Sequence, residues 1–220
     1  MNVFDIIGPV MVGPSSSHTA GAVRIGKITR SILGEAPVLV KVQLHGSFAK
    51  TYQGHGTDKA ITGGLLGFDT DDARIRDSLE IAASCGLRIT FETIQIKDAH
   101  PNTALITAKG NSGKIVTAMG SSIGGGNIII RQINGLKVEV TGEYYTILIS
   151  HRDTPGVVAS VTGILAQNQI NIASMDVYRS NRGGSALMII EIDQKAGNEL
   201  EMQLSYLSGV VSVAFIEPII

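Results

Sequence analysis

The chain has 220 residues, of which 44% are hydrophobic, and this is enough for two small domains. Only 17% of the residues are charged, the net charge is −1 and no basic run is present, so nucleic acid is excluded as an expected partner. The single cysteine, Cys85, excludes an internal disulfide, and the default expectation for it is a buried structural thiol. The sequence starts with no signal-peptide pattern, and no apolar run reaches the roughly 20 residues of a membrane span, so we expect a cytoplasmic protein without a membrane partner.

The first part of the chain mixes helix and strand patterns. A short apolar segment at residues 3–7 precedes a loop rich in Gly, Pro and Ser at residues 13–19. Apolar residues at 23, 25, 28 and 32 then predict a helix that stops at Gly34. Alternation over residues 38–45 predicts a strand with His45 on its more polar face.

The middle of the chain changes from a glycine-broken segment to short strands. Residues 46–67 are interrupted by glycines, and Asp71 or Asp72 is placed to cap a helix that ends at Gly86. Five short β-type runs follow, separated by turn signals. These runs cover residues 88–96, 103–108, 114–118, 127–133 and 136–140.

Residues 141–143 form the predicted boundary between two domains. Beyond it the order is strand 145–150, a helix after the turn at 153–156, strands 171–179 and 186–193, a second helix, and strand 210–216. This β-α-β-β-α-β order is the ferredoxin-like arrangement. The predicted fold class is therefore α+β, with a mixed domain at 1–142 and a ferredoxin-like module at 143–220.

Histidines are the candidate chemical groups of the first domain. His18 lies in the hydroxyl-rich loop before the first helix, where N–H groups and hydroxyls can face an anion; the alternative is that Ser17 or Thr19 only caps the helix. His55 lies between two glycines, which suits a general base close to a ligand, but a flexible surface turn explains the same pattern.

Three other readings of these residues stay open. Ser17, His18 and Asp58 have the residue types of a hydrolytic triad, although no nucleophile-elbow motif is present. His55 and Asp58 have a spacing that suits a metal, together with His18 or His45. The glycine-rich string at 120–126 suits an anion-binding loop between two strands, although no helix follows it.

Taken together, several strings resemble the beta chain of the iron–sulfur type of L-serine dehydratase. The most specific pair is Gly-Pro-Ser-Ser-Ser-His-Thr at 13–19 with Gly-His-Gly-Thr-Asp at 54–58. Further matches are Phe4-Asp5, Gly46-Ser47, His100-Pro101-Asn102-Thr103 and Ser122-Ile123-Gly124-Gly125-Gly126. The C-terminal module resembles an ACT domain, with Asp153, Gly156 and Asn171 in that family's ligand-loop positions.

The resemblance implies an enzyme that converts L-serine into pyruvate and ammonia with a 4Fe–4S cluster. In that family an open iron site acts as a Lewis acid on the substrate oxygen while a base removes the Cα proton. By motif, His55 is similar to the proposed base and His18 to a second active-site histidine. The surrounding substrate pocket would be formed by Ser15, Ser16, Ser17, Thr19, Thr57 and Asp58.

One cysteine cannot hold such a cluster, so the resemblance implies a separate alpha chain that supplies the thiolates, and no metal ligand in this chain. The ACT domain implies either binding of an amino acid or pairing into a higher oligomer. A different class of function also fits: the first domain is similar to the allosteric substrate-binding domain of some D-3-phosphoglycerate dehydrogenases, which would make it a non-catalytic sensor. The histidine-bearing strings favour the enzyme, because a sensor needs no base.

Overall fold

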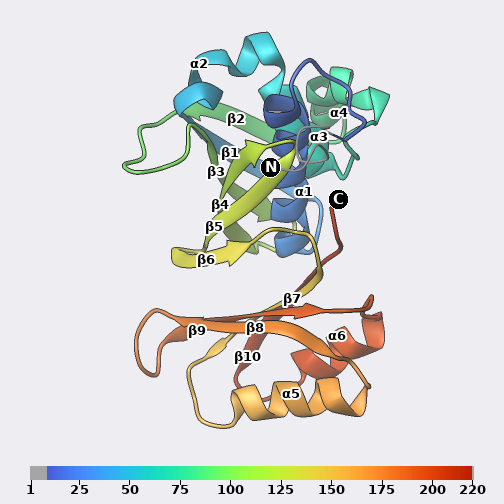
Figure 1. Ribbon diagram of the computed structural model, residues 1–220, viewed down its shortest axis with the longest axis vertical. Helices are drawn as coiled ribbons and strands as arrows, with labels where there is room; N and C mark the ends of the chain where they lie inside the picture. Colours follow the sequence, from blue (N-terminus) through green and yellow to red (C-terminus); the bar gives the residue numbers. More distant parts are fainter. Residues whose placement is uncertain (1–8, 220) are drawn as a thin grey trace. The chain divides into compact units, whose positions relative to one another are not determined.

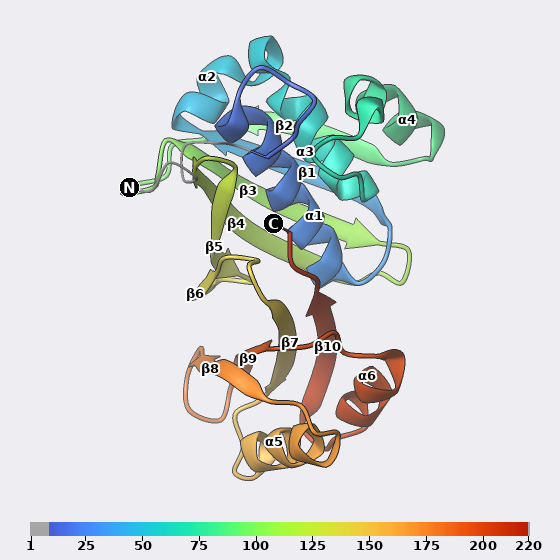
Figure 2. The same cartoon turned by 45° about the vertical axis from the view of Figure 1, so that its right-hand side comes forward.

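A computed structural model describes residues 9–219, which divide into two compact units at residue 141 (Figures 1 and 2). The apolar segment at 3–7 and the Phe4-Asp5 match lie outside the described residues. In the described part of the chain, no helix is long and apolar enough to cross a membrane. Both units combine helices with a sheet, so the predicted α+β class is confirmed.

The first unit contains a six-stranded sheet of order β2-β1-β3-β4-β5-β6. Strands β1 and β2 are parallel and every other neighbouring pair is antiparallel. The strands are β1 (Pro37–His45), β2 (Arg88–Thr93), β3 (Asn102–Gly110), β4 (Ile115–Gly124), β5 (Asn127–Ile133) and β6 (Leu136–Val140).

One face of this sheet is covered by helices and the other is largely open. The alternating residues Val40, Val42 and Leu44 of β1 are fully buried, whereas the neighbouring Leu39 and Lys41 are exposed. This is the period-two burial expected for a strand with one face on the core. The register places the buried residues of β1 beside Ala104, Ile106 and Ala108 of β3, which continue the core face.

Among the described residues, six helical segments cover the core face and the end of the sheet where β1 stops. They are the π-helical turn η2 (Ser16–Ala20), α1 (Gly21–Leu33), α2 (Gly46–His55), α3 (Thr57–Leu66), the 3-10 turn η3 (Ala73–Asp77) and α4 (Ser78–Ser84). The predicted first helix is confirmed as α1, with Gly34 in the left-handed conformation at its end. Of the two predicted capping residues, Asp71 and Asp72, the structure uses Asp72, whose side chain accepts a hydrogen bond from the Arg74 N–H at the start of η3.

The glycine-broken segment at 46–67 is in fact two helices, α2 and α3, joined at Gly56 in the left-handed conformation. The glycines do not break α3, because Gly64 of α3 and Gly26 of α1 let the two helices pack closely. A Cβ on Gly64 would lie 2.0 Å from the Val23 carbonyl oxygen of α1, and a Cβ on Gly26 would lie 2.4 Å from the Ile61 carbonyl oxygen of α3. Helices α1 and α3 thus approach backbone to backbone.

Two further expectations are corrected. The string at 120–126 is not a loop: strand β4 continues to Gly124, with irregular pairing to β5 near Gly120 and Gly124, and the turn into β5 has three successive glycines at positive φ. Strand pairing fixes this segment because Gly120 pairs with Ala104 on one side and Ile130 on the other. Cys85 is exposed at the end of α4 rather than buried, since the short helix ends there.

The second unit has the β-α-β-β-α-β order that the sequence predicts. Its sheet has the order β10-β7-β9-β8, and all its neighbouring strands are antiparallel. Its core consists of residues from the sheet and both helices, including Ile147, Val161, Met188 and Leu204. The elements are β7 (Tyr145–Arg152), α5 (Val157–Gln167), β8 (Ile172–Arg179), β9 (Ser185–Ile192), α6 (Asn198–Ser205) and β10 (Val210–Ile216).

Candidate functional site

The hydroxyl-rich string at 15–19 forms a single wide helical turn that leads directly into α1, not the predicted loop. The Gly21 N–H donates to the Ser16 carbonyl five residues earlier, which is the π-helical pattern. The Thr19 N–H donates to the Ser15 carbonyl at 2.8 Å. Inside a helix such turns are rare and are frequently found at functional sites. Here the turn buries His18 and Thr19.

His18 is held through both ring nitrogens by serine hydroxyls. Its Nδ1 lies 3.3 Å from Ser15 Oγ and its Nε2 lies 3.2 Å from Ser47 Oγ at the start of α2. Burial, and after it the nearby His55, lower the pKa of His18 below its usual value. A neutral imidazole has one donor and one acceptor, and a hydroxyl can satisfy either, so these contacts fit the neutral ring.

His55 lies beside His18 but in a different environment. The two ring centroids are 4.8 Å apart in an edge-to-face arrangement. His55 is exposed at the last residue of α2, and among the described residues neither of its ring nitrogens has a hydrogen-bond partner. The structure therefore brings the two predicted histidines together: one is buried and fixed, and the other is exposed with its nitrogens available.

The loop before β3 fixes the position of Ser47. The Ser47 N–H donates to the Pro101 carbonyl at 2.7 Å, and Gly46 has a positive φ with Pro101 so close that a Cβ would lie 2.5 Å from the same oxygen. Thr103 Oγ1 donates to the His100 carbonyl at 2.6 Å and closes this loop. The string at 100–103 thus positions the hydroxyl that contacts His18.

Several buried polar atoms of the first unit have no hydrogen-bond partner among the described residues. They are Thr19 Oγ1, Arg24 Nε, Thr57 Oγ1, Asn102 Oδ1 and Ser122 Oγ. Thr19 lies on the π-helical turn and Thr57 opens α3 two residues after His55. An unsatisfied buried hydroxyl costs about 1–3 kcal/mol, and such atoms in native proteins call for an explanation such as a ligand or water.

The side-chain positions do not support the triad or the metal site. Both nitrogens of His18 face Ser15 and Ser47 rather than Ser17 or Asp58, and Asp58 Oδ1 accepts the Lys59 N–H at 2.8 Å. His45 Nδ1 accepts the Ile96 N–H at 3.2 Å and so anchors the loop after β2. Within residues 9–219, no three His, Cys, Asp or Glu side chains are grouped so that they could hold a metal ion.

Comparisons with known proteins decide the family. Residues 2–133 match the serine dehydratase beta chain family, and residues 145–209 match the ACT domain family. The chain belongs to the serine dehydratase beta chain family. It is 47% identical over 212 residues to the probable L-serine dehydratase beta chain of Bacillus subtilis, with 96% of each chain covered, and 39% identical over 217 residues to the L-serine dehydratase beta chain of Peptoniphilus asaccharolyticus, with 98% of each covered.

The similarity behind the sensor alternative also exists, but it is weaker. The D-3-phosphoglycerate dehydrogenase of Bacillus subtilis is 26% identical over 195 residues, which cover 88% of this chain and 37% of that protein. The full-length matches to serine dehydratase beta chains are closer, and the two histidines lie together. The family assignment therefore agrees with the enzyme class that the sequence strings favoured.

In the ACT unit of this family member, the three candidate ligand residues lie at two different ends of the sheet. Asp153 and Gly156 follow β7 at the end where Arg152 pairs with Ser185, whereas Asn171 precedes β8 at the end where Ile172 pairs with Ile192. The three residues therefore do not converge on one small ligand within a single ACT unit.

Two of these residues already have partners. Asp153 Oδ2 accepts the Gly183 N–H at 3.0 Å and lies 3.1 Å from the Arg179 guanidinium; the Gly183 hydrogen bond, and after it Arg179, hold the pKa of Asp153 below its usual value. Asn171 Nδ2 donates to Asp193 Oδ2 at 2.7 Å. These contacts close the loops of the unit, which is a structural role for both side chains.

Replacing Asp58 with asparagine is expected to raise the free energy of unfolding at neutral pH. Burial raises the pKa of Asp58, and the Lys59 N–H opposes this shift only in part. When the folded-state pKa exceeds the unfolded one, stability is lost as pH rises from the unfolded value, 3.8, through the folded value. Urea denaturation should therefore show a more stable Asp58→Asn variant at neutral pH and no difference below the unfolded pKa. Equal stability at neutral pH would contradict this account.

Proposed function

We propose that the chain is the beta subunit of an L-serine ammonia-lyase, which converts L-serine into pyruvate and ammonia together with an alpha subunit. The observation that carries the proposal is the pair of histidines beside the π-helical turn. One imidazole is exposed with its nitrogens available, and the other is buried with its pKa lowered. Membership of the serine dehydratase beta chain family supports the choice of substrate.

The iron–sulfur cluster that the resemblance implies does not fit the described residues of this chain. Such clusters need three or four thiolates, whereas the only cysteine, Cys85, is exposed at the end of α4. In the proposal, therefore, the alpha subunit holds the 4Fe–4S cluster and this chain contributes side chains to the substrate. The relatives named as beta chains support this division between two subunits.

In this proposal His55 is the general base. The reaction removes a proton from Cα and the β-hydroxyl of L-serine as water, and the resulting 2-aminoacrylate becomes an imine that hydrolyses to pyruvate and ammonia. An imidazole titrates near neutral pH and suits the removal of the Cα proton. His55 is exposed at a helix end, so a substrate bound against this face of the chain can reach its ring.

The other predicted site residues have supporting roles in the proposal. His18 stays neutral between Ser15 and Ser47, and its ring packs edge-to-face against the His55 ring and so restricts the position of that ring. Ser16 and Ser17 are half-buried on the same turn and are assigned to substrate binding with Thr19. Thr57 and Asp58 open α3 directly behind His55, and the unpartnered Thr57 hydroxyl is available for a hydrogen bond.

The proposal is tested by measuring pyruvate formation from L-serine by the alpha–beta complex. Anaerobic co-expression with a cysteine-bearing alpha chain of the same family should give a complex that forms pyruvate, whereas each chain alone should not. Activity of this polypeptide by itself would overturn the division into two subunits. A complex that retains its cluster but forms no pyruvate would overturn the proposed function.

For the ACT unit we propose a role in assembly. The two ligand-loop side chains are engaged within the unit, and the candidate positions are separated along the sheet. An amino acid that used all three positions would need two copies of the unit. Pairing of ACT units would bring the assembly to a higher oligomer than one alpha and one beta subunit.

A further inference from the structure

A cavity of about 350 Å³ lies next to His55 in the first unit. Its wall consists of segment 12–14, the end of α2 with the corner into α3 at 53–56, and the four residues Thr19, Lys59, Ile75 and Arg76. His55 belongs to this wall, whereas His18 does not. None of the lining residues is acidic, and three of them carry basic side chains. The cavity therefore offers a positive environment beside His55.

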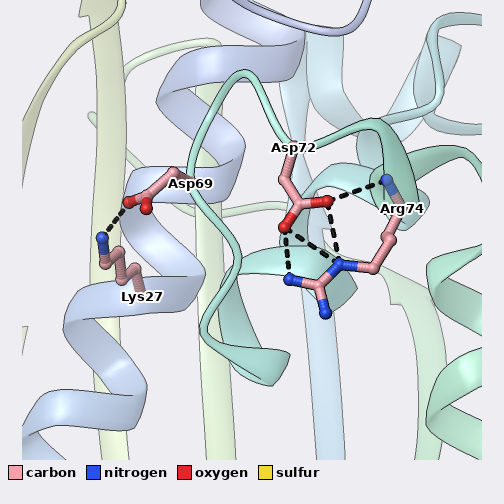
Figure 3. A network of polar contacts seen from close by, with 4 residues as sticks. All are labelled: Lys27, Asp69, Asp72 and Arg74. Carbon is pink, nitrogen blue, oxygen red and sulfur yellow. Dashed lines mark hydrogen bonds and ion pairs between the residues drawn. The ribbon is translucent and has the colours of Figure 1, made fainter.

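The two permanently charged cations of the wall have no counter-ion of their own. Among the described residues, neither Lys59 nor Arg76 forms an ion pair or a side-chain hydrogen bond, although Asp58 interacts with Lys59 electrostatically. The neighbouring cations are engaged: Lys27 pairs with Asp69, and Arg74 binds both carboxylate oxygens of Asp72 (Figure 3). Lys59 and Arg76 are thus distinguished from the other cations around them.

The same network fixes the turn of backbone that carries Arg76. Asp72 accepts the Arg74 N–H at 2.9 Å and caps η3, while the Arg74 guanidinium lies 4.2 Å from the centroid of the Phe68 ring (Figure 3 shows the Asp72–Arg74 contacts). Ser78 Oγ donates to the Lys59 carbonyl at 2.7 Å and ties the next helix to α3. The turn that carries Ile75 and Arg76 is therefore fixed at both ends, next to the helix that carries Lys59.

Two other features of the wall favour an anion. Helix α3 begins at Thr57 beside the corner at Gly56, and the positive end of its dipole favours a negative charge there, although the Lys59 N–H of this turn is already taken by Asp58 Oδ1. Thr19 is 2% exposed and its hydroxyl has no partner among the described residues. Gly13 lies so close that a Cβ there would be 2.2 Å from Thr19 Oγ1, so the glycine is needed to let the chain cover this hydroxyl.

We propose that this cavity is the subsite for the carboxylate of the amino-acid substrate, bound by Arg76 and Lys59 with His55 on the same wall. The inference rests on the proposed function and adds the residues that recognise the substrate. A planar guanidinium and a carboxylate form paired, charge-assisted hydrogen bonds, and an ammonium adds a second positive contact.

The positions of Arg76, Lys59 and His55 around one cavity would orient the bound substrate for the reaction. A carboxylate held by Arg76 and Lys59 fixes one substituent of Cα, and His55 is close to the same space. The Cα–H bond then has a restricted set of orientations toward the imidazole. Arg76 and Lys59 bind the ground state and the transition state alike, so their loss should raise KM more than it lowers kcat.

The test uses the alpha–beta complex with Arg76→Gln and Lys59→Met. Each variant is expected to raise KM for L-serine by about tenfold, the loss typical of a hydrogen bond to a charged group, with kcat changed far less. The matched controls are Arg88→Gln on the edge strand β2 and Lys109→Met at the far end of β3. Both residues are exposed and lie outside the cavity wall, so neither control should change KM.

A second measurement separates the carboxylate from the rest of the substrate. L-Alanine and L-alaninamide are used as competitive inhibitors, since both lack the leaving hydroxyl and only alanine has a carboxylate. Arg76→Gln should raise the inhibition constant of alanine about tenfold and leave that of alaninamide unchanged. Equal effects on both inhibitors, or an unchanged KM in both variants, would overturn the proposal, as would alanine acting as an activator, which would make the cavity an effector site.

Direct binding distinguishes failure of this inference from failure of the proposed function. Calorimetric titration of the complex with L-alanine reports on the subsite without any turnover. Alanine binding that depends on Arg76 and Lys59 in a complex inactive on L-serine would support the carboxylate site and remove only the proposed reaction. Pyruvate formation by a complex in which neither substitution weakens alanine binding would remove the subsite and leave the reaction.

Discussion

Replacing His55 with glutamine is expected to lower kcat of the alpha–beta complex by about 10²–10⁴-fold, the range typical for the loss of a general base. Glutamine keeps a polar side chain at the end of α2 but cannot accept and release a proton near neutral pH. The side chain is exposed and its ring lies beside the His18 ring at the surface end of α2, so the fold should be unaffected. Steady-state pyruvate formation from L-serine measures the effect.

The pH dependence of the same variant gives a second readout. In the unmodified complex, kcat/KM should fall at low pH as acid protonates the general base. In His55→Gln the residual rate should lack this acidic limb. A variant that keeps near-normal turnover, or one that loses activity while its acidic limb persists, would remove His55 as the base. An unchanged thermal midpoint establishes that the loss is chemical rather than structural.

The strands of both units were the part of the fold that the sequence predicted best. The β-type runs at 127–133, 136–140 and 210–216 have the observed bounds, because short runs rich in Val and Ile are typical of strands. The Asn134-Gly135 turn lies between two of these strands with both residues at positive φ. Local signals were sufficient there, since the element and its turn lie within about a dozen residues.

The helices α2 and α3 could not be predicted from the same signals. Gly54, Gly56, Gly63 and Gly64 suggested a broken segment, since glycine is unfavourable inside a helix by about 1 kcal/mol. The cost is offset by a contact that only the tertiary structure contains, the close approach of α3 to α1. The intrinsic propensity of the segment was therefore overridden by packing against a helix about forty residues away in sequence.

The candidate site was predictable in its residue types but not in its geometry. His18 and His55 stand out through the strings that carry them, and the structure brings their rings together. Ser47 was visible only as part of a matching string, and nothing in the sequence connected it with His18 Nε2. Lys59 and Arg76 gave no signal, because isolated basic residues on a helix are ordinary, and only the cavity relates them to each other.

Gly64→Ala is expected to destabilise the first unit by about 3 kcal/mol or more, at the upper end of the cost of overpacking. The added Cβ would lie 2.0 Å from the Val23 carbonyl oxygen and 2.8 Å from the Lys27 N atom, and these are backbone atoms that cannot turn away. Helices α1 and α3 must then separate, and they carry the π-helical turn with His18 and the corner with His55. Pyruvate formation should therefore fall together with stability.

The adjacent residue provides the matched control. A Cβ on Gly63 would meet only side chains, 3.1 Å from Ile75 Cγ1 and 3.5 Å from Phe68 Cδ2, and alanine favours a helix over glycine by about 1 kcal/mol. Gly63→Ala should therefore change stability by less than about 1 kcal/mol. Hydrogen exchange of α1 and α3, read by mass spectrometry, should accelerate in Gly64→Ala alone, while exchange of α5 and α6 in the ACT unit stays unchanged. Equal protection of α1 and α3 in the two variants would mean that the helices do not depend on backbone contact at Gly64, and that the two histidines are held together by other contacts.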